Sequence, residues 1–221
     1  MSRVNKIYLF IILFFIFSSY NPKNLKNIRV IFPIKNIIIE DTKVININKL
    51  NKELSFLQEK SIFSINKFKI SEVILENEFI ASIKIKKIYP NTIKIIVKER
   101  KPIAIQVGVN KKFYLTAEGK LIKFYEIESY KNLPLIFGKQ ENFKSLYSLL
   151  NKIGFPVNEI KTFYYFDIKR WDIFLKNNRL IKLPVENYLD SLQNYIEIKD
   201  NKNFDKYKIF DYRIKDQLVL K

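Results

Sequence analysis

Cysteine and histidine are both absent from this 221-residue chain. Without cysteine there is no disulfide, no thiolate nucleophile and no thiolate metal site. Without histidine the chain also lacks the commonest general base and the commonest metal-binding side chain. An enzyme built from this sequence would therefore have to rely on carboxylates, lysine, tyrosine or serine.

Glycine is scarce, with four isolated residues in the whole chain. A phosphate-binding loop or a dinucleotide-binding turn needs several glycines at close, fixed spacing. Neither pattern is present, so we expect no cofactor.

What the chain has in excess is positive charge and apolar residues. The net charge is +18, and 48% of the residues are hydrophobic, which argues against wholesale disorder. So large a basic surplus raises nucleic acid or an anionic membrane as a partner. Because the basic residues are mostly lysine and are spread along the chain, we interpret them first as solvated surface.

An apolar run begins directly after Arg3 and Lys6, and no charge occurs between residues 7 and 22. As a helix these 16 residues would span roughly 24 Å, short for a hydrocarbon core of about 30 Å. A cleaved signal peptide has a similar pattern, but Ser18-Ser19-Tyr20 is not the small-x-small ending that cleavage prefers. We expect an uncleaved transmembrane anchor, with a signal peptide as the alternative. The expected order is a cytoplasmic tail (1–6), the anchor (7–22) and a linker (23–33).

The next part of the chain predicts a small α+β sandwich with helices on one face of a sheet. Period-two alternation on either side of Tyr89-Pro90-Asn91-Thr92 predicts a β-hairpin with a proline turn. The remaining expected elements are a strand (35–39), a helix (46–57), a short extended piece (61–65) and a second helix (67–78).

The hairpin ends in Glu99-Arg100-Lys101-Pro102. Pro102 has no N–H to donate and favours an extended residue before it, so the ladder should stop there. We expect a domain junction at which the chain changes sheet, involving Glu99, Arg100 and Pro102. Glu99 and Arg100 are further predicted to brace the two domains, although exposed strand-end charges are often simply solvated.

Residues 103–221 predict a strand-rich β domain with two helices and a C-terminal edge strand. Asn177-Asn178 between two alternating segments indicates a tight turn. The expected strands are 103–108, 112–116, 121–125, 158–167, 170–176, 179–183 and 206–220, and the expected helices are 141–153 and 185–198.

Several motifs occur in an order that resembles the bacterial cell-division family FtsQ/DivIB, from about residue 28 to the end. Each motif alone is weak, but their order and spacing behind an N-terminal apolar segment are specific. The motifs are Phe79-Ile80, Tyr89-Pro90-Asn91, Glu99-Arg100-Lys101-Pro102-Ile103-Ala104, Glu118-Gly119, Leu133-Pro134 with Gly138, the Trp171 hairpin and Asp211-Tyr212-Arg213.

The resemblance implies a POTRA domain over 34–102 and a β domain over 103–221. It further implies a non-catalytic, single-pass scaffold of the inner membrane, concentrated at the division septum, whose exported domains link early and late division proteins. The implied partners are FtsB and FtsL, and through them the septal peptidoglycan synthase. No small-molecule substrate and no metal are implied.

The last strand is the best candidate for a partner site, because an edge strand exposes unpaired backbone groups that can accept another strand. Arg213 could pair with a partner carboxylate, and Ile214 could fill a pocket. The alternative is an ordinary edge strand that finishes a sheet. With the positions that the resemblance adds, the predicted partner-binding residues are Lys169, Arg170, Arg213, Ile214, Asp216 and Leu218.

Two rival functions use other features. Residues 161–179 interleave aromatic and basic side chains, as single-stranded nucleic-acid binders do, but a half-buried hairpin needs the same alternation. A wall-cleaving enzyme would need an oriented carboxylate pair. The candidates Glu76 and Glu78 face different ways on a helix, and Asp167 and Asp172 have nothing to orient them.

Overall fold

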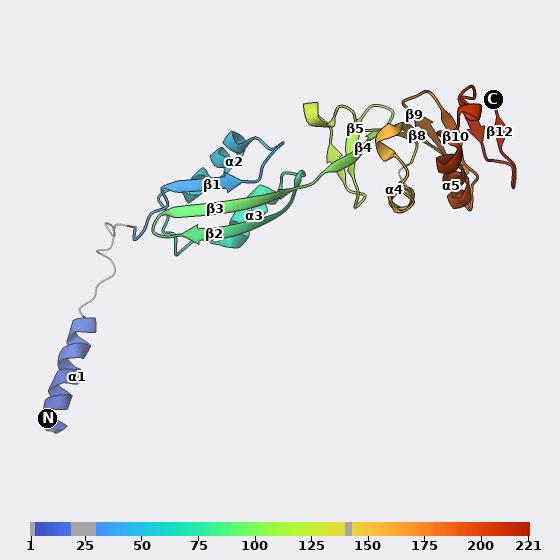
Figure 1. Cartoon of the computed structure of the whole chain (residues 1–221). Coiled ribbons are helices and arrows are strands. Elements are labelled where there is room, and N and C mark those ends of the chain that lie inside the picture. Colours follow the sequence, from blue (N-terminus) through green and yellow to red (C-terminus); the bar gives the residue numbers. More distant parts are fainter. Residues whose placement is uncertain (1–2, 19–29, 140–142) are drawn as a thin grey trace.

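The computed structural model describes residues 3–18, 30–139 and 143–221 (Figure 1). An N-terminal helix precedes two modules, which follow one another along an elongated body. Several predicted segments lie partly outside the described residues. These parts are residues 1–2 of the tail, 19–22 of the anchor, 23–29 of the linker and 141–142 of the helix expected over 141–153.

Helix α1 covers Arg3–Ser18, and its large apolar side chains from Ile7 to Phe17 are 43–79% exposed. Among the residues that the structure describes, no helix combines the length and the apolar character needed to cross a membrane. The transmembrane helix expected over 7–22 is therefore not shown, and residues 19–22 of that expected span lie outside the described residues.

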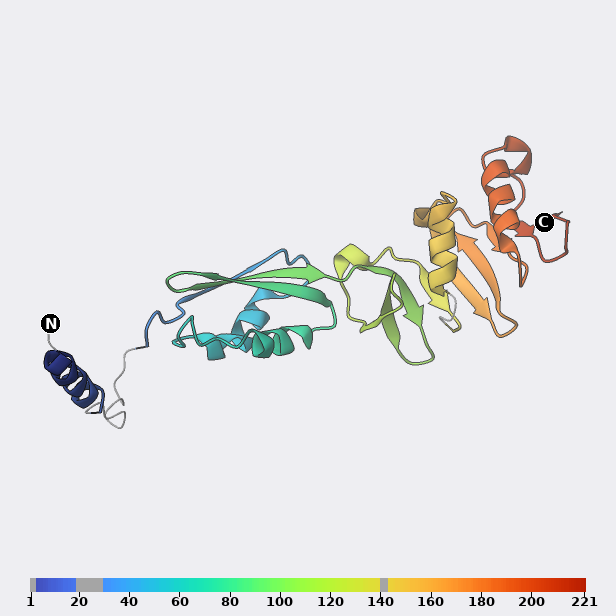
Figure 2. The ribbon, with the colours of Figure 1, turned by 90° about the horizontal axis from the view of Figure 1, so that it is seen from below.

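The first module has a three-stranded sheet in the order β1-β3-β2, with β1 parallel and β2 antiparallel to β3. Its two α-helices cover one face of this sheet (Figure 2). The elements are β1 (Asn36–Glu40), α2 (Ile47–Glu53), the 3₁₀ turn η2 (Ser55–Leu57), α3 (Lys67–Leu75), β2 (Ile80–Ile88) and β3 (Thr92–Glu99).

Local chemistry explains where the helices of this module begin. The Asn46 side chain caps α2 and the Asn66 side chain caps α3, each accepting two backbone N–H groups of the first turn.

Two predicted elements of this module differ in the structure. The helix expected over 46–57 is interrupted, since α2 ends at Glu53 and the 3₁₀ turn η2 follows. The extended piece expected over 61–65 is not a strand, since only Ser61 makes a bridge, to Pro33.

Glu99, at the end of β3, binds a loop of its own module. Its carboxylate accepts the N–H groups of Lys43, Val44 and Ile45 at 2.9–3.1 Å. The charge therefore holds the loop between β1 and α2 against the end of the hairpin.

We expect Glu99→Gln to lower the free energy of unfolding by about 1–3 kcal/mol, because hydrogen bonds to a charged acceptor are stronger than those to an amide. Urea unfolding would measure this loss. Glu40→Gln is the matched control: it removes an ion pair to Lys94 at 2.8 Å on a half-exposed carboxylate and should cost less than about 1 kcal/mol. Equal losses in the two variants would contradict the anchoring role of Glu99.

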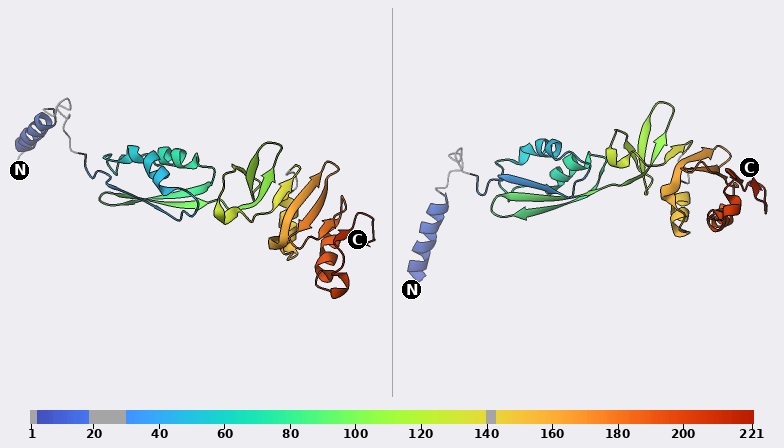
Figure 3. Two further views of the ribbon diagram at one scale, coloured as in Figure 1. Left: turned by 90° about the horizontal axis from the view of Figure 1, so that it is seen from above. Right: turned by 45° about the horizontal axis from the view of Figure 1, so that its top comes forward.

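The second module has a nine-stranded sheet in the order β12-β11-β10-β9-β8-β7-β4-β5-β6. Helices α4 and α5 lie on one face of it, on the opposite side of the elongated body from α2 and α3 (Figure 3). The elements are β4 (Pro102–Val107), β5 (Lys112–Thr116), β6 (Leu121–Lys123), η3 (Glu128–Tyr130), β7 (Leu135–Phe137), α4 (Phe143–Lys152), η4 (Val157–Glu159), β8 (Ile160–Phe166), β9 (Arg170–Leu175), β10 (Leu180–Lys182), α5 (Tyr188–Ile198), η5 (Lys202–Phe204), β11 (Ile209–Asp211) and β12 (Val219–Leu220).

Strand β7 was not expected from the sequence, yet it joins the two halves of the sheet. It pairs in parallel with both β4 and β8. Gly138, which follows it, has a φ of 91°, and a Cβ there would collide with the carbonyl oxygen of Tyr165. Glycine is therefore required at the end of this short strand.

The two modules share one core at their junction. Phe79 lies within ring-contact distance of Tyr114, Tyr125 and Tyr130, all of the second module. The Glu78 carboxylate also accepts the backbone N–H of Lys123 at 2.7 Å. The first module's buried cluster thus continues into the second.

The predicted junction residues take different places. The chain does change sheet between Glu99 and Pro102, and Pro102 is the first residue of β4. The Arg100 guanidinium donates to the carbonyls of Glu78 and Ile80, so it supports from within the first module the segment that carries Phe79. Its charge reaches the second module weakly: the pKa of Glu118 is lowered mainly by a hydrogen bond to Thr116 and, to a lesser extent, by Arg100.

Candidate partner-binding surface

The sheet of the second module ends at a two-residue edge strand. β12 pairs antiparallel with β11, and Lys221 extends the ladder through its hydrogen bonds with Lys208 and Ile209. In the described part of the chain, no strand lies on the other side of β12. The backbone on that side is placed to pair with an added strand.

The continuous last strand expected over 206–220 is wrong. The chain leaves the sheet after Asp211, turns, and returns at Val219. Asp216 has a φ of 58°, in the left-handed region, and the Gln217 N–H donates to the Ile214 carbonyl at 3.2 Å. The alternation of apolar and polar residues in this segment is typical of a strand and gives no sign of the turn. Aspartate adopts the left-handed conformation more readily than most residues.

The loop from Tyr212 to Leu218 forms one wall of a groove with a volume of about 730 Å³. The other wall is the segment Pro184–Asn187 together with the first turns of α5. Val185 and Ile214 are about half exposed there, at 45% and 54%. The groove thus offers apolar side chains beside the edge strand.

Four of the six predicted partner-binding residues are brought together on this loop: Arg213, Ile214, Asp216 and Leu218. The other two lie at the β8–β9 turn, where Lys169 is exposed with a φ of 63° and Arg170 packs over the Phe166 ring at 4.4 Å. Sequence reasoning missed the wall formed by Val185 and α5, because no local signal indicates which distant segment will face the loop.

A row of charged residues links the β8–β9 turn to the loop. Asp172, Lys182 and Asp211 lie directly opposite one another on β9, β10 and β11. The Arg170 Nε lies 3.2 Å from the Asp172 carboxylate, and Arg213 forms a two-point pair with Asp211 at 2.7 and 2.6 Å. The row thus combines two buried carboxylates with three basic side chains, those of Arg170, Lys182 and Arg213.

The two carboxylates of the row differ electrostatically. Hydrogen bonds from Arg213 lower the pKa of Asp211. Burial raises the pKa of Asp172, while the charge of Arg170 opposes that rise.

The Arg213 guanidinium is already paired with Asp211 within the chain. A partner carboxylate would have to accept from the remaining N–H donors of Arg213, whose side chain is 42% exposed.

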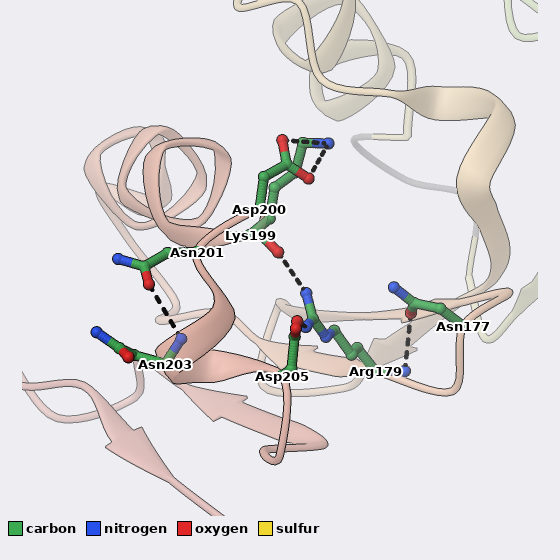
Figure 4. Close-up of polar contacts among 7 residues, drawn as sticks. All are labelled: Asn177, Arg179, Lys199, Asp200, Asn201, Asn203 and Asp205. Atoms are coloured by element: carbon green, nitrogen blue, oxygen red, sulfur yellow. Dashed lines mark hydrogen bonds and ion pairs between the residues drawn. The ribbon is translucent and has the colours of Figure 1, made fainter.

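A buried arginine holds the segment before β11 in place (Figure 4). Arg179 donates to the carbonyl of Lys199, at the end of α5, at 2.7 Å and to the Asp205 carboxylate at 2.9 Å. Its guanidinium also packs over the Phe210 ring, 5.5 Å from the centroid. Arg179 thus ties the start of β10, the end of α5 and β11 together, although the sequence singled it out only as part of a basic, aromatic stretch.

That stretch, residues 161–179, forms the β8–β9 hairpin and the turn after it. Asn178 has a φ of 64° and makes the expected tight turn. Phe163 and Trp171 are buried in the core under α4 and cannot stack on bases. The alternation is therefore explained by one buried face, and nothing here supports the nucleic-acid alternative.

The described residues contain no group of three or more side chains placed to hold a metal ion. The carboxylates considered for catalysis are also separated in role, since Glu78 binds the Lys123 backbone and Asp172 pairs with Arg170.

Comparison with known proteins agrees with this architecture. A family model described as POTRA domain, FtsQ-type, matches residues 32–100, and one described as Cell division protein FtsQ/DivIB, C-terminal, matches residues 103–213. The Cell division protein FtsQ of Rickettsia bellii is 31% identical over 194 residues, which cover 86% of this chain and 72% of that protein. The proteins of the same name from Rickettsia typhi and Methylomonas methanica are 29% and 23% identical, covering 86% and 76% of this chain and 72% and 68% of their own lengths. The chain therefore belongs to the FtsQ/DivIB family of cell division proteins.

Proposed function

We propose that this chain is a non-catalytic scaffold of the division complex that binds its partner by strand addition at β12. The partners are FtsB and FtsL, which in turn act on the septal peptidoglycan synthase. In this proposal residues 34–102 form the recruiting module and residues 103–221 form the partner-binding module. The observation that carries the proposal is an edge strand next to a groove in which Val185 and Ile214 are about half exposed among polar side chains.

Strand addition supplies affinity through backbone hydrogen bonds and specificity through side-chain pockets. Here β12 provides the backbone edge, and Ile214, Val185 and Leu218 provide the apolar contacts. The basic side chains Lys169, Lys182 and Arg213 favour a partner that presents carboxylates beside its apolar anchor, because charge complementarity steers association.

The membrane part of the proposal rests on α1. Its large apolar side chains from Ile7 to Phe17 are exposed around the helix. An exposed apolar surface of this extent marks a segment that contacts a membrane or another protein. α1 is proposed to insert into the inner membrane as the anchor, with both modules on its outer side and the protein concentrated at the septum.

We expect Ile214→Asp to weaken partner binding by at least about thirtyfold, because a central apolar anchor contributes about 2 kcal/mol or more and a buried carboxylate adds a desolvation cost. Titration with the purified FtsB–FtsL partner would measure the change. The melting temperature should hardly move, since the side chain is 54% exposed.

Val109→Asp is the matched control, because Val109 is fully exposed in the β4–β5 turn, away from the groove. It should bind like the unmodified chain. Unchanged affinity of Ile214→Asp would remove the groove from the interface, and equal losses in the two variants would show that added negative charge alone weakens binding.

A further inference from the structure

Three aromatic rings contact one another on the surface at one end of the first module. Phe63 lies between Phe32 and Tyr89, with centroid distances of 5.6 and 5.3 Å. The three residues are 46–58% exposed, and their chain neighbours Ile31 and Ile88 are 64% and 44% exposed. We call these five residues the tip patch.

The tip patch is held firmly by the fold. The Ile62 N–H donates to the Phe32 carbonyl at 3.0 Å, and Ile62 itself is fully buried. Phe32 has a φ of 53°, which a bulky residue rarely adopts and which persists only where the surroundings impose it. The rings are therefore presented on a rigid base.

The patch lies at the end of the module where the chain arrives from α1 (Figure 1). Eleven residues lie between Ser18, the last residue of α1, and Val30, which makes twelve steps from Cα to Cα. Even a fully extended chain of that length reaches at most about 40 Å. The tip patch can therefore not be far from whatever surface α1 occupies.

Charge around the patch is strongly one-sided. The segments 30–35, 59–64 and 86–91, which build the tip, contain four lysines and one acidic residue, Glu59. The Lys87 ammonium donates to the Phe63 carbonyl at 3.4 Å, so one of these charges lies directly beside the rings. No aspartate or glutamate occurs before Glu40 in the sequence.

We propose that the tip patch rests on the surface of an anionic lipid bilayer and so fixes the first module against the membrane. Tyrosine, with its polar hydroxyl, and lysine, with its long stem, favour the boundary between headgroups and acyl chains. The two phenylalanines supply apolar area that can enter this boundary. Lysine clusters next to a membrane are further attracted by anionic headgroups. The proposal rests on the anchoring by α1 proposed above.

A lipid surface fits these features better than a protein partner does. The chain itself restricts the patch to the neighbourhood of the anchor, and the lysines at the tip match headgroup charge without any specific geometry. A protein partner would need its own acidic, apolar face within the same short distance.

Single-cysteine labelling tests the proposal cleanly because the chain has no cysteine of its own. The full chain is reconstituted into vesicles of phosphatidylcholine and phosphatidylglycerol, and an environment-sensitive fluorophore is attached at Ile88→Cys, which keeps all three rings. Quenching by a lipid-borne spin label reports contact with the membrane. Ile12→Cys reports insertion of α1, and Val109→Cys in the second module is the distant control.

We expect quenching at positions 12 and 88 and none at 109. The double variant Phe63→Ser/Tyr89→Ser should reduce quenching at 88 by about threefold or more, because binding in the interface scales with the apolar area that enters it. Vesicles of phosphatidylcholine alone, or added salt, should also reduce it. Both serine positions are more than half exposed, and an unchanged melting temperature confirms that the variant folds.

Quenching at 12 without quenching at 88 would overturn the tip-patch proposal and leave the anchor intact. Absence of quenching at 12 would overturn the anchor and, with it, this inference. Protection of position 88 from aqueous iodide without lipid quenching would show a protein contact instead. Quenching at 88 that is insensitive to phosphatidylglycerol and salt would overturn the role given to the lysines.

Discussion

Replacing Phe79 with alanine is expected to lower the free energy of unfolding by about 3–5 kcal/mol, the usual cost of removing a buried phenylalanine. The side chain is 2% exposed, and its ring centroid lies 5.4 Å from that of Tyr125 and 5.8 Å from that of Tyr114. Both tyrosines belong to the second module. The cavity would therefore open at the junction of the modules and not within one of them.

Phe79→Ala should also uncouple the unfolding of the two modules. In the unmodified chain the first module's core continues into the second through Phe79 and Tyr114, so both modules should unfold in one transition. In the variant we expect two transitions, because the modules would keep their separate cores. Trp171, the only tryptophan, is buried in the second module and reports that module by fluorescence, while far-ultraviolet circular dichroism reports the whole chain.

Ile70→Ala is the matched control for this experiment. Ile70 is fully buried on α3, within the first module. Its removal should cost about 2–5 kcal/mol without separating the two signals, because the junction stays packed. A single shared transition in Phe79→Ala, or separated transitions in both variants, would contradict a coupling role for Phe79.

The parts of the fold that the sequence predicted correctly are those with strong local signals. The β2–β3 hairpin follows from its alternation and from the turn at Pro90, and the change of sheet follows from Pro102. Strand β7 was missed because three residues are too few to show a period, and its place between β4 and β8 is decided by tertiary pairing. The junction cluster was missed for the same reason: nothing near Phe79 in the sequence indicates the tyrosines that it meets.

The candidate site was predictable only in part. Arg213, Ile214, Asp216 and Leu218 lie together because they are close in sequence, but the loop that carries them was expected to be a strand. The pairing of Arg213 with Asp211 had a signal that was overlooked, since residues two apart at a strand end share a face. Lys169 and Arg170 came from the family resemblance, and the charged row that links them to the loop depends on strand order, which local patterns do not determine.

Replacing Arg179 with alanine is the second large effect that we expect, with a loss of about 2–4 kcal/mol in the free energy of unfolding. The cost comes mainly from the Lys199 carbonyl, which would lose its donor in a part-buried place, and from lost packing over Phe210. The ion pair to Asp205 contributes less, because that carboxylate is 65% exposed and would return to water.

The effect should be concentrated near the edge strand. Arg179 ties the end of α5 to β11, and β12 pairs with β11, so the variant should show faster hydrogen exchange at Ile209–Asp211 and weaker partner binding. Lys199→Ala is the matched control: it removes a neighbouring cation but keeps the backbone carbonyl, and it should cost less than about 1 kcal/mol. If both variants lost the same small amount, Arg179 would be an ordinary surface charge. If Arg179→Ala lost stability with exchange at β11 unchanged, the edge strand would be positioned by its ladder alone.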